Sequence, residues 1–241
     1  MRGLGTIINA AAIVVGGLLG LVFKRFIKES MQETLLRATG ACVMILGIGG
    51  AMAEMLSVEN DLLTTRGSLM MILCFVLGSF AGELMDTEGG FVRLGIWLRK
   101  KSGNAGDHEF LVAFLNASLT VCIGAMAIVG SIQDGLTGDY SMLAAKAVLD
   151  FVIVMVLAAS MGKGAVFSAV PVAVLQGTVT ALAGLLAPVM TAKAISNLSF
   201  TGSVLIFCVG VNLVWDKRFK TANMLPAIVF AVIYALVFPG A

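Results

Sequence analysis

The sequence predicts an all-α integral membrane protein that forms one polytopic domain over residues 1–241. Of the 241 residues, 59% are hydrophobic and only 12% are charged, and the mean hydropathy is +1.01. Water-soluble domains are about half apolar and about a quarter charged. The apolar stretches are also long and unbroken, whereas the strands of a membrane barrel are about ten residues long and alternate in polarity. Helices fit this pattern, and about eight of them are expected to cross the membrane.

A helical span needs about 20 apolar residues to cross roughly 30 Å of hydrocarbon. Eight runs approach or reach that length: about 4–23, 38–57, 67–86, 110–132, 142–162, 164–187, 199–216 and 223–239. Two longer links, 24–37 and 87–109, mix basic residues with apolar ones at near-helical spacing, and they predict short helices in the membrane interface. A solvated loop explains the first link equally well. It explains the second less well, because Trp97 favours the headgroup level.

Basic residues fall mostly in alternate links. With eight spans, the links on one side hold twelve lysines and arginines: Lys24, Arg25, Lys28, Arg37, Arg93, Arg99, Lys100, Lys101, Lys163, Lys217, Arg218 and Lys220. The other side holds three, Arg2, Arg66 and Lys193, and Lys146 lies within a span. Short cytoplasmic links carry the excess of basic residues, so the basic side is predicted to face the cytoplasm. Both termini are then predicted to lie outside.

Two stretches early in the chain resemble two stretches late in it. Residues 14–22, VVGGLLGLV, resemble 181–189, ALAGLLAPV, and residues 37–50, RATGACVMILGIGG, resemble 199–212, SFTGSVLIFCVGVN. The matches pair spans 1–3 with spans 6–8, which run in opposite directions. They predict an inverted repeat, a plan found in transporters with a site near the bilayer midplane. Chance similarity between apolar strings is the alternative.

The fifth predicted span, residues 142–162, carries a lysine and an aspartate. At a rise of about 1.5 Å per residue, Asp150 lies roughly 12 Å inside the span, close to the middle of a core about 30 Å thick. Lys146 is one turn nearer the end, on the same helix face. A central aspartate costs about 3 kcal/mol or more on insertion scales. Such residues line a solute or ion pathway, or they form a buried ion pair that locks helices together.

Other polar residues accompany this charged pair. Gln133 and Asp134 end the fourth span, Gln176 lies near the middle of the sixth, and Asn9 opens the first. Pro171 predicts a kink in the sixth span, because proline lacks the backbone donor and clashes with the preceding turn. The candidate substrate- or ion-binding residues, between spans 4, 5 and 6, are Asp150, Lys146, Gln176, Asp134, Gln133 and Asn9. A solvated hairpin after span 4 and a simple packing kink in span 6 are the alternatives.

Several function classes are not indicated. The net charge of +2 provides no basic surface for a nucleic acid. The chain has one histidine, His108, and four cysteines without metal-ligand spacing, so no metal and no cofactor is predicted. It has no HExxH and no G-x-S-x-G motif, and it is not predicted to be an enzyme. The predicted partners are the lipid bilayer and a small solute or ion, and glycine pairs such as Gly16/Gly20 also permit a homo-oligomer.

Longer strings of the sequence resemble a known family. They are GSIQDGLTGDYSMLAAKAVLDF, GAVFSAVPVAVLQGTVTALA, the N-terminal GTIINAAAIVVGGLLG and the C-terminal IFCVGVNLVWDKRFKTANMLPAI. These strings are similar to the bacterial membrane family catalogued as domain of unknown function 554, and the resemblance covers nearly the whole chain. It implies a multi-pass protein of the bacterial cytoplasmic (inner) membrane. It implies no substrate, cofactor or catalytic residue.

Two functions from different classes fit these observations. The leading hypothesis is a small-solute or ion transporter whose path is lined by the six candidate residues, with Asp150 as a proton or cation coupling site. The alternative is a membrane scaffold or signalling protein whose polar residues only fix helix packing. Transport predicts a hydrated cavity lined by spans 5 and 6, whereas a scaffold predicts that Asp150 is sealed against Lys146 in a packed bundle.

Overall fold

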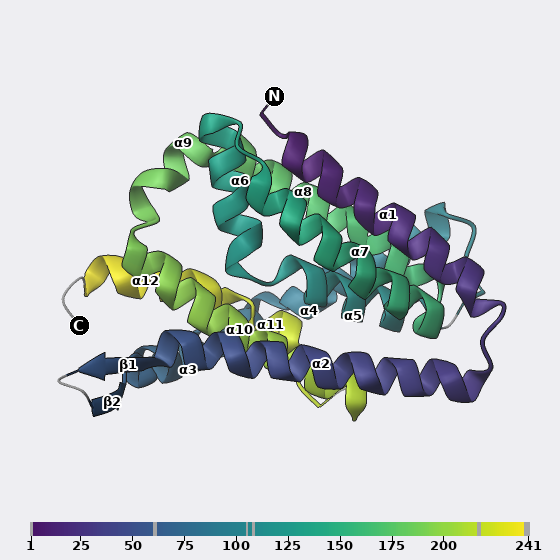
Figure 1. The fold of residues 1–241 in the computed structure, drawn as a ribbon, viewed down its shortest axis with the longest axis horizontal. Helices are drawn as coiled ribbons and strands as arrows, with labels where there is room; N and C mark the ends of the chain where they lie inside the picture. The colour runs from purple at the N-terminus through teal and green to yellow at the C-terminus, as the bar shows by residue number, and fades with distance from the viewer. Residues whose placement is uncertain (1, 60–61, 105, 108, 216–217, 239–241) are drawn as a thin grey trace.

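The protein is a bundle of helices with a short hairpin between α2 and α3 (Figure 1). The computed structural model describes residues 2–59, 62–104, 106–107, 109–215 and 218–238, so His108 and Lys217 lie outside the described residues. The elements are α1 (Leu4–Lys24), α2 (Glu29–Met55), β1 (Leu56–Glu59), β2 (Leu62–Thr65), α3 (Ser68–Met85), α4 (Thr87–Lys101), α5 (Phe110–Cys122), α6 (Ala125–Thr137), α7 (Ser141–Met161), the 3₁₀ segment η1 (Lys163–Ser168), α8 (Ala169–Ala181), α9 (Ala183–Leu186), the 3₁₀ segment η2 (Ala187–Val189), α10 (Ala192–Val214), α11 (Thr221–Met224) and α12 (Pro226–Val237).

The described chain contains six helices that are long and apolar enough to cross a membrane: α1, α2, α3, α7, the η1–α8 segment and α10. α5 and α6 together form a seventh candidate, bent by 62° between them. The segment Thr221–Val237, which comprises α11 and α12, is a shorter apolar helix. The multi-pass helical class is therefore confirmed. The count of eight spans is not, because the eighth predicted span corresponds to this shorter segment.

The outer surface of the bundle is apolar, as expected for helices that face hydrocarbon. Large exposed side chains follow one face of each outer helix: Ile7, Val14, Leu18 and Val22 on α1, Leu69, Ile72, Val76 and Phe80 on α3, and Val148, Leu149 and Val152 on α7. The largest buried cluster gathers side chains of α1, α2, α5, α7, α8 and α10. α7, with its two charged residues, therefore presents one face outward and the other to the bundle core.

Glycines allow the closest helix contacts. A Cβ atom on Gly16 or Gly20 of α1 would overlap a backbone carbonyl of α7, and a Cβ on Gly78 or Gly82 of α3 would overlap the backbone of α12 or α11. Small residues spaced four apart let membrane helices approach in this way. α1 and α7 consequently pack backbone to backbone, and this contact positions the N-terminal half of α1 beside the charged pair.

Helices that are related by the internal sequence match pack against each other. α2 packs on α10, α3 on α12, and α1 contacts α8. The α2–α10 pair is antiparallel, since Gly40 approaches Val214 while Gly47 approaches Phe207. Residues 37–50 and 199–212 both lie inside continuous helices, but 14–22 lies inside α1 whereas 181–189 crosses the end of α8, α9 and η2. The second match thus joins equivalent local structures and the first does not.

Three local predictions differ from the structure. Residues 29–37 belong to the 27-residue helix α2 and form no separate helix, although 87–101 do form one, α4. The predicted continuous span 110–132 breaks after Cys122. The hairpin of β1 and β2 occupies a link in which the sequence analysis expected no strands. The kink at Pro171 stays a prediction: Pro171 lies in the first turn of α8, directly after the 3₁₀ segment η1.

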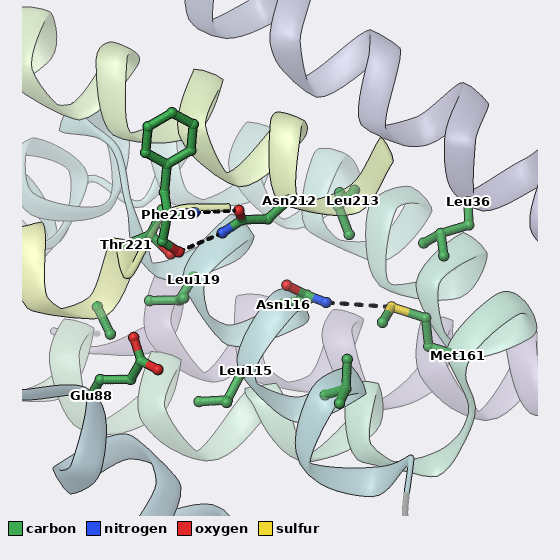
Figure 2. A pocket seen from close by; sticks show the side chains of 12 residues that line it. Leu36, Glu88, Leu115, Asn116, Leu119, Met161, Asn212, Leu213, Phe219 and Thr221 are labelled. Carbon is green, nitrogen blue, oxygen red and sulfur yellow. Dashed lines mark hydrogen bonds between the residues drawn. The ribbon is translucent and has the colours of Figure 1, made fainter. Parts of the chain in front are cut away.

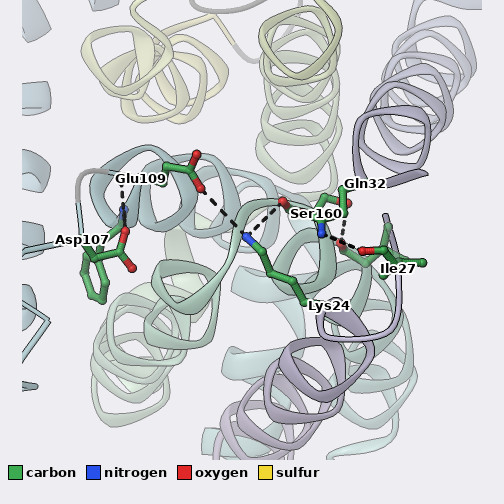
Figure 3. Close-up of polar contacts among 8 residues, drawn as sticks. Lys24, Ile27, Gln32, Asp107, Glu109 and Ser160 are labelled. Carbon is green, nitrogen blue, oxygen red and sulfur yellow. Dashed lines mark hydrogen bonds and ion pairs between the residues drawn. The ribbon is translucent and has the colours of Figure 1, made fainter. Parts of the chain in front are cut away.

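Links that the sequence analysis assigned to one side of the membrane are bonded to one another. Lys24 Nζ contacts the Ser160 carbonyl oxygen at 3.5 Å and Glu109 Oε2 at 3.9 Å (Figure 3). Lys163 Nζ donates to Asn104 Oδ1 at 3.1 Å. The ends of α1, α4 and α7 and the start of α5 therefore gather at one end of the bundle, which we call the basic end.

Candidate functional site

The charged pair of the fifth predicted span holds three helices together. Lys146 Nζ on α7 lies 2.8 Å from Asp150 Oδ1 and 2.7 Å from Asp150 Oδ2. Lys146 also donates to the Val121 carbonyl oxygen of α5 at 2.8 Å, and Asn9 Nδ2 of α1 donates to Asp150 Oδ2 at 3.0 Å. We call these four residues the polar cluster. It is enclosed, since Lys146 is 6% exposed and Asp150 is 3% exposed.

The Val121 carbonyl is available to Lys146 because the helix ends there. α5 stops at Cys122 and α6 starts at Ala125, and the last carbonyls of a helix have no partner within it. The Lys146 ammonium satisfies one of these carbonyls and also complements the negative end of the helix dipole. Gly124 makes the bend, with φ 139° and ψ 150°, a conformation that is essentially restricted to glycine.

The break is not apparent in the sequence. The run 110–132 contains no proline, and its apolar character continues through the bend. Gly124 is the only local signal, and the chain has 28 glycines, most of which lie inside helices. Neither hydropathy nor composition singles out this glycine.

Gln176 is the second buried polar feature. It lies on α8 with 0% exposure, and neither its Nε2 nor its Oε1 atom has a hydrogen-bond partner within the described protein. The same holds for Asn9 Oδ1 and for the hydroxyls of Thr6 and Thr180. An unsatisfied buried polar group costs about 1–3 kcal/mol, and native proteins pair nearly all such groups with protein, water or ligand. These atoms therefore indicate an interior that accommodates something polar.

A pocket of about 600 Å³ leads toward these atoms. Thr6 of α1 and Gly177 and Thr180 of α8 line it, together with residues of α6 and α9, and we call it the α1–α8 pocket. Asn9 lies three residues beyond Thr6 and Gln176 lies four before Thr180, so each amide is about one helical turn from a lining threonine. Polar side chains thus continue along α1 from the pocket to Asp150.

A second pocket, of about 310 Å³, approaches from the basic end. Figure 2 shows Asn116 and Leu119 of α5 across from Leu213 of α10, with Leu36 of α2 and Met161 of α7 at one side. We call it the α5–α10 pocket. It reaches α5 two residues before Val121, but neither this pocket nor the α1–α8 pocket is lined by Lys146, Asp150 or Gln176. In this conformation the charged pair is sealed, as the scaffold hypothesis expects.

Asp134 has a different role from the polar cluster. It is fully buried on α6, and its carboxylate accepts hydrogen bonds from the backbone N–H groups of Gly3 at 3.1 Å and Gly5 at 2.9 Å. It therefore caps the N-terminus of α1 and complements the positive end of that helix dipole. Its neighbour Gln133 is half-buried on α6. Of the six candidates, the structure joins Asn9, Lys146 and Asp150, encloses Gln176 separately, and uses Asp134 to fix α1.

A family model described as "Protein of unknown function (DUF554)" matches residues 4–236. The chain belongs to this family. A Bacillus subtilis (strain 168) relative, "Uncharacterized membrane protein YdfK", is 27% identical over 224 residues, which cover 93% of this chain and 92% of that protein. "Uncharacterized protein YqgA" of Escherichia coli (strain K12) is 29% identical over 233 residues, which cover 95% and 94% of the two chains. No solved structure matches the chain.

In this DUF554 protein, Asp134→Ala should weaken the attachment of α1. The substitution leaves the buried N–H of Gly5 without its acceptor, which costs about 1–3 kcal/mol. We expect a lower thermal unfolding midpoint in detergent. Asp139→Ala should lower it less, because Asp139 is exposed and water can replace its carboxylate as the acceptor for the Ser141 N–H and hydroxyl. Equal midpoints for Asp134→Ala and the unmodified protein would contradict the capping role.

Proposed function

We propose that this protein carries a small solute or ion across the bacterial cytoplasmic membrane. The path passes near the bilayer midplane between the broken helix α5/α6, α7 and α8, with α1 contributing Asn9. Both termini lie outside the cell, and the basic end faces the cytoplasm, where short links carry most of the lysines and arginines. The proposal assigns no catalytic residue.

The observation that carries the proposal is the unpartnered amide of Gln176. A packing role would place its donor and its acceptor against protein groups, because an unpaired amide in a core destabilises the fold. A polar ligand that passes between α8 and its neighbours would supply the missing hydrogen bonds. The unpartnered Oδ1 of Asn9, on the residue that bonds Asp150, extends the same argument to the polar cluster.

The broken helix provides independent support. Interrupted spans in membranes are tolerated where the freed backbone groups are buried in protein or line a cavity, and transporters use them to build midplane sites. Here the freed carbonyl of Val121 belongs to the polar cluster. α5 lines the α5–α10 pocket and α6 lines the α1–α8 pocket, so the two halves of one span reach pockets at opposite ends of the bundle.

The packing of α2 on α10 and α3 on α12 also favours the inverted repeat that the internal match predicts. A repeat of this kind gives a transporter two related halves that can rock about a fixed site. The sealed pair then corresponds to a closed conformation, in which neither pocket has access to Asp150.

A scaffold is the second candidate function, and one specific observation favours it. Lys146 and Asp150 compensate each other, and the remaining contacts of the pair go to Asn9 and the Val121 carbonyl. A static ion pair that locks α1, α5 and α7 needs no water or ligand. The scaffold hypothesis nevertheless gives no reason for an enclosed Gln176 whose amide has no partner among the described residues.

Flux measurements on proteoliposomes test the proposal. Wild-type vesicles should pass at least one probe faster than protein-free vesicles, with urea and glycerol followed by stopped-flow light scattering and with Na⁺, K⁺, Cl⁻ and H⁺ followed by ion-sensitive dyes. Asp150→Asn should slow that flux about tenfold or more, equivalent to about 1.4 kcal/mol of barrier, because the Lys146 charge then lacks its counter-charge.

The matched control is Asp139→Asn, the same substitution at an exposed carboxylate. The Ser141 hydroxyl and backbone N–H hold the pKa of Asp139 below its usual range, and the residue lies away from the polar cluster. Its flux should equal that of the unmodified protein. If Asp150→Asn transports at the unmodified rate, Asp150 is not part of the mechanism, and if no probe crosses, the scaffold is the better account.

A further inference from the structure

We infer that the site takes a small neutral solute that both donates and accepts hydrogen bonds, of the amide or polyol class, and that this solute enters through the α1–α8 pocket. The inference rests on the proposed function and narrows it from a small solute or ion to one chemical class. Three features of the described residues carry it: the balance of charge, the kinds of unpartnered atoms, and the free space around them.

The charges deep in the bundle are already held by partners. Asp150 is paired with Lys146, and the Asp134 carboxylate accepts from two backbone N–H groups at the start of α1. Arg2 keeps its positive charge, but it is exposed at the α1–α8 pocket and donates to the Leu136 carbonyl oxygen. An ion that moved beyond it to Asn9 and Gln176 would meet a charged pair that is already neutral, and burying an ion without an opposite charge is far more costly than burying a neutral polar group.

The unpartnered atoms are of both kinds. Gln176 has an unpartnered NH₂ donor and an unpartnered carbonyl acceptor, and Asn9 Oδ1 is a further acceptor. The hydroxyls of Thr6 and Thr180 can act as either. A cation would bind only the oxygens and an anion only the donors, so an ion of either sign would leave half of the Gln176 amide unpaired. A solute with its own N–H or O–H groups and its own oxygen pairs both halves.

The pocket has room for such a solute. Its volume of about 600 Å³ lies within the usual range of about 300–1,000 Å³ for small-molecule sites. Gly177, next to Gln176, and Gly184 line it, and a Cβ atom placed on either would meet nothing within 4 Å. The backbone of α8 is therefore accessible from the pocket immediately beside the Gln176 position, with no side chain in between.

Gln176→Met tests the inference, because methionine keeps the length of glutamine and removes both polar atoms. Removing unsatisfied buried atoms should leave the thermal unfolding midpoint equal or raise it. The flux of urea or glycerol into proteoliposomes should fall about tenfold or more. Gln32→Met is the matched control: Gln32 donates to the Ile27 carbonyl oxygen near the start of α2 (Figure 3), and its variant should transport these probes at the unmodified rate.

The outcomes separate the inference from the proposed function. Passage of urea or glycerol that depends on Gln176 supports both. If only ions cross, and Asp150→Asn slows them, the protein is a transporter but the neutral-solute inference is wrong. The inference is also wrong if urea or glycerol crosses and Gln176→Met leaves that flux unchanged. If no probe crosses, both fail. A marked drop in the unfolding midpoint of Gln176→Met would also contradict the inference, since it would show that the amide has a structural partner.

Discussion

Lys146→Met alone should destabilise the protein far more than the double substitution Lys146→Met/Asp150→Leu. Breaking a buried ion pair by removing one partner typically costs about 3–5 kcal/mol, because the other charge is left uncompensated, whereas replacing both partners with apolar residues of similar volume is often neutral or stabilising. In the single variant, the Asp150 carboxylate keeps the Asn9 amide as its one side-chain hydrogen-bond partner among the described residues, and the Val121 carbonyl loses its donor.

The unfolding midpoint and the flux of the same variants separate the two functions. We expect the double variant to fold with an unfolding midpoint near that of the unmodified protein and to transport no probe. Stability would then be kept while transport is lost. A scaffold predicts that they move together. If the double variant unfolds as readily as Lys146→Met, the pair is required for folding itself, and the argument that it is kept for transport loses its basis.

Gly20→Val should separate α1 from α7. A Cβ atom at this position would overlap the carbonyl oxygen of Met155, a backbone atom that cannot rotate away as a side chain can. Overpacking of this kind costs about 1–3 kcal/mol and occasionally more. Because α1 also carries Asn9 and Thr6, its displacement should lower both the unfolding midpoint and the flux.

Gly49→Val is the matched control for this prediction. Gly49 is exposed on α2, and a Cβ atom there would meet nothing within 4 Å. Valine on this outer surface should leave both the midpoint and the flux unchanged. Equal midpoints for Gly20→Val and Gly49→Val would show that the close contact between α1 and α7 does not stabilise the bundle.

The fold class could be predicted from the sequence because it depends on hydropathy, which is a one-dimensional property. The pairing of Lys146 with Asp150 could also be predicted from the sequence, because a spacing of four residues places both on one face of a helix. The third member, Asn9, lies 141 positions from Asp150 along the chain. Its contact with Asp150 depends on the glycine-mediated packing of α1 against α7, which the sequence does not encode locally.

Asp134 shows where the sequence reasoning was limited. Asp134 and Asp150 are both buried carboxylates, and the sequence analysis assigned both to the path. Asp134 instead caps α1, a role that becomes visible only when the end of α6 is known to lie beside residues 3–5. The break at Gly124 is similar, because its φ of 139° is open to any glycine and the hydropathy of the run is continuous through it.

If the protein works as proposed, the polar interior between α1, α7 and α8 receives a ligand. The most direct measurement is an experimental structure of the protein in lipid with urea or glycerol present, at a resolution that shows ordered water. We predict density for the solute or for water, hydrogen-bonded to the Gln176 amide. A Gln176 side chain whose donor and acceptor are both bonded to protein groups, with no such density beside it, would contradict the account.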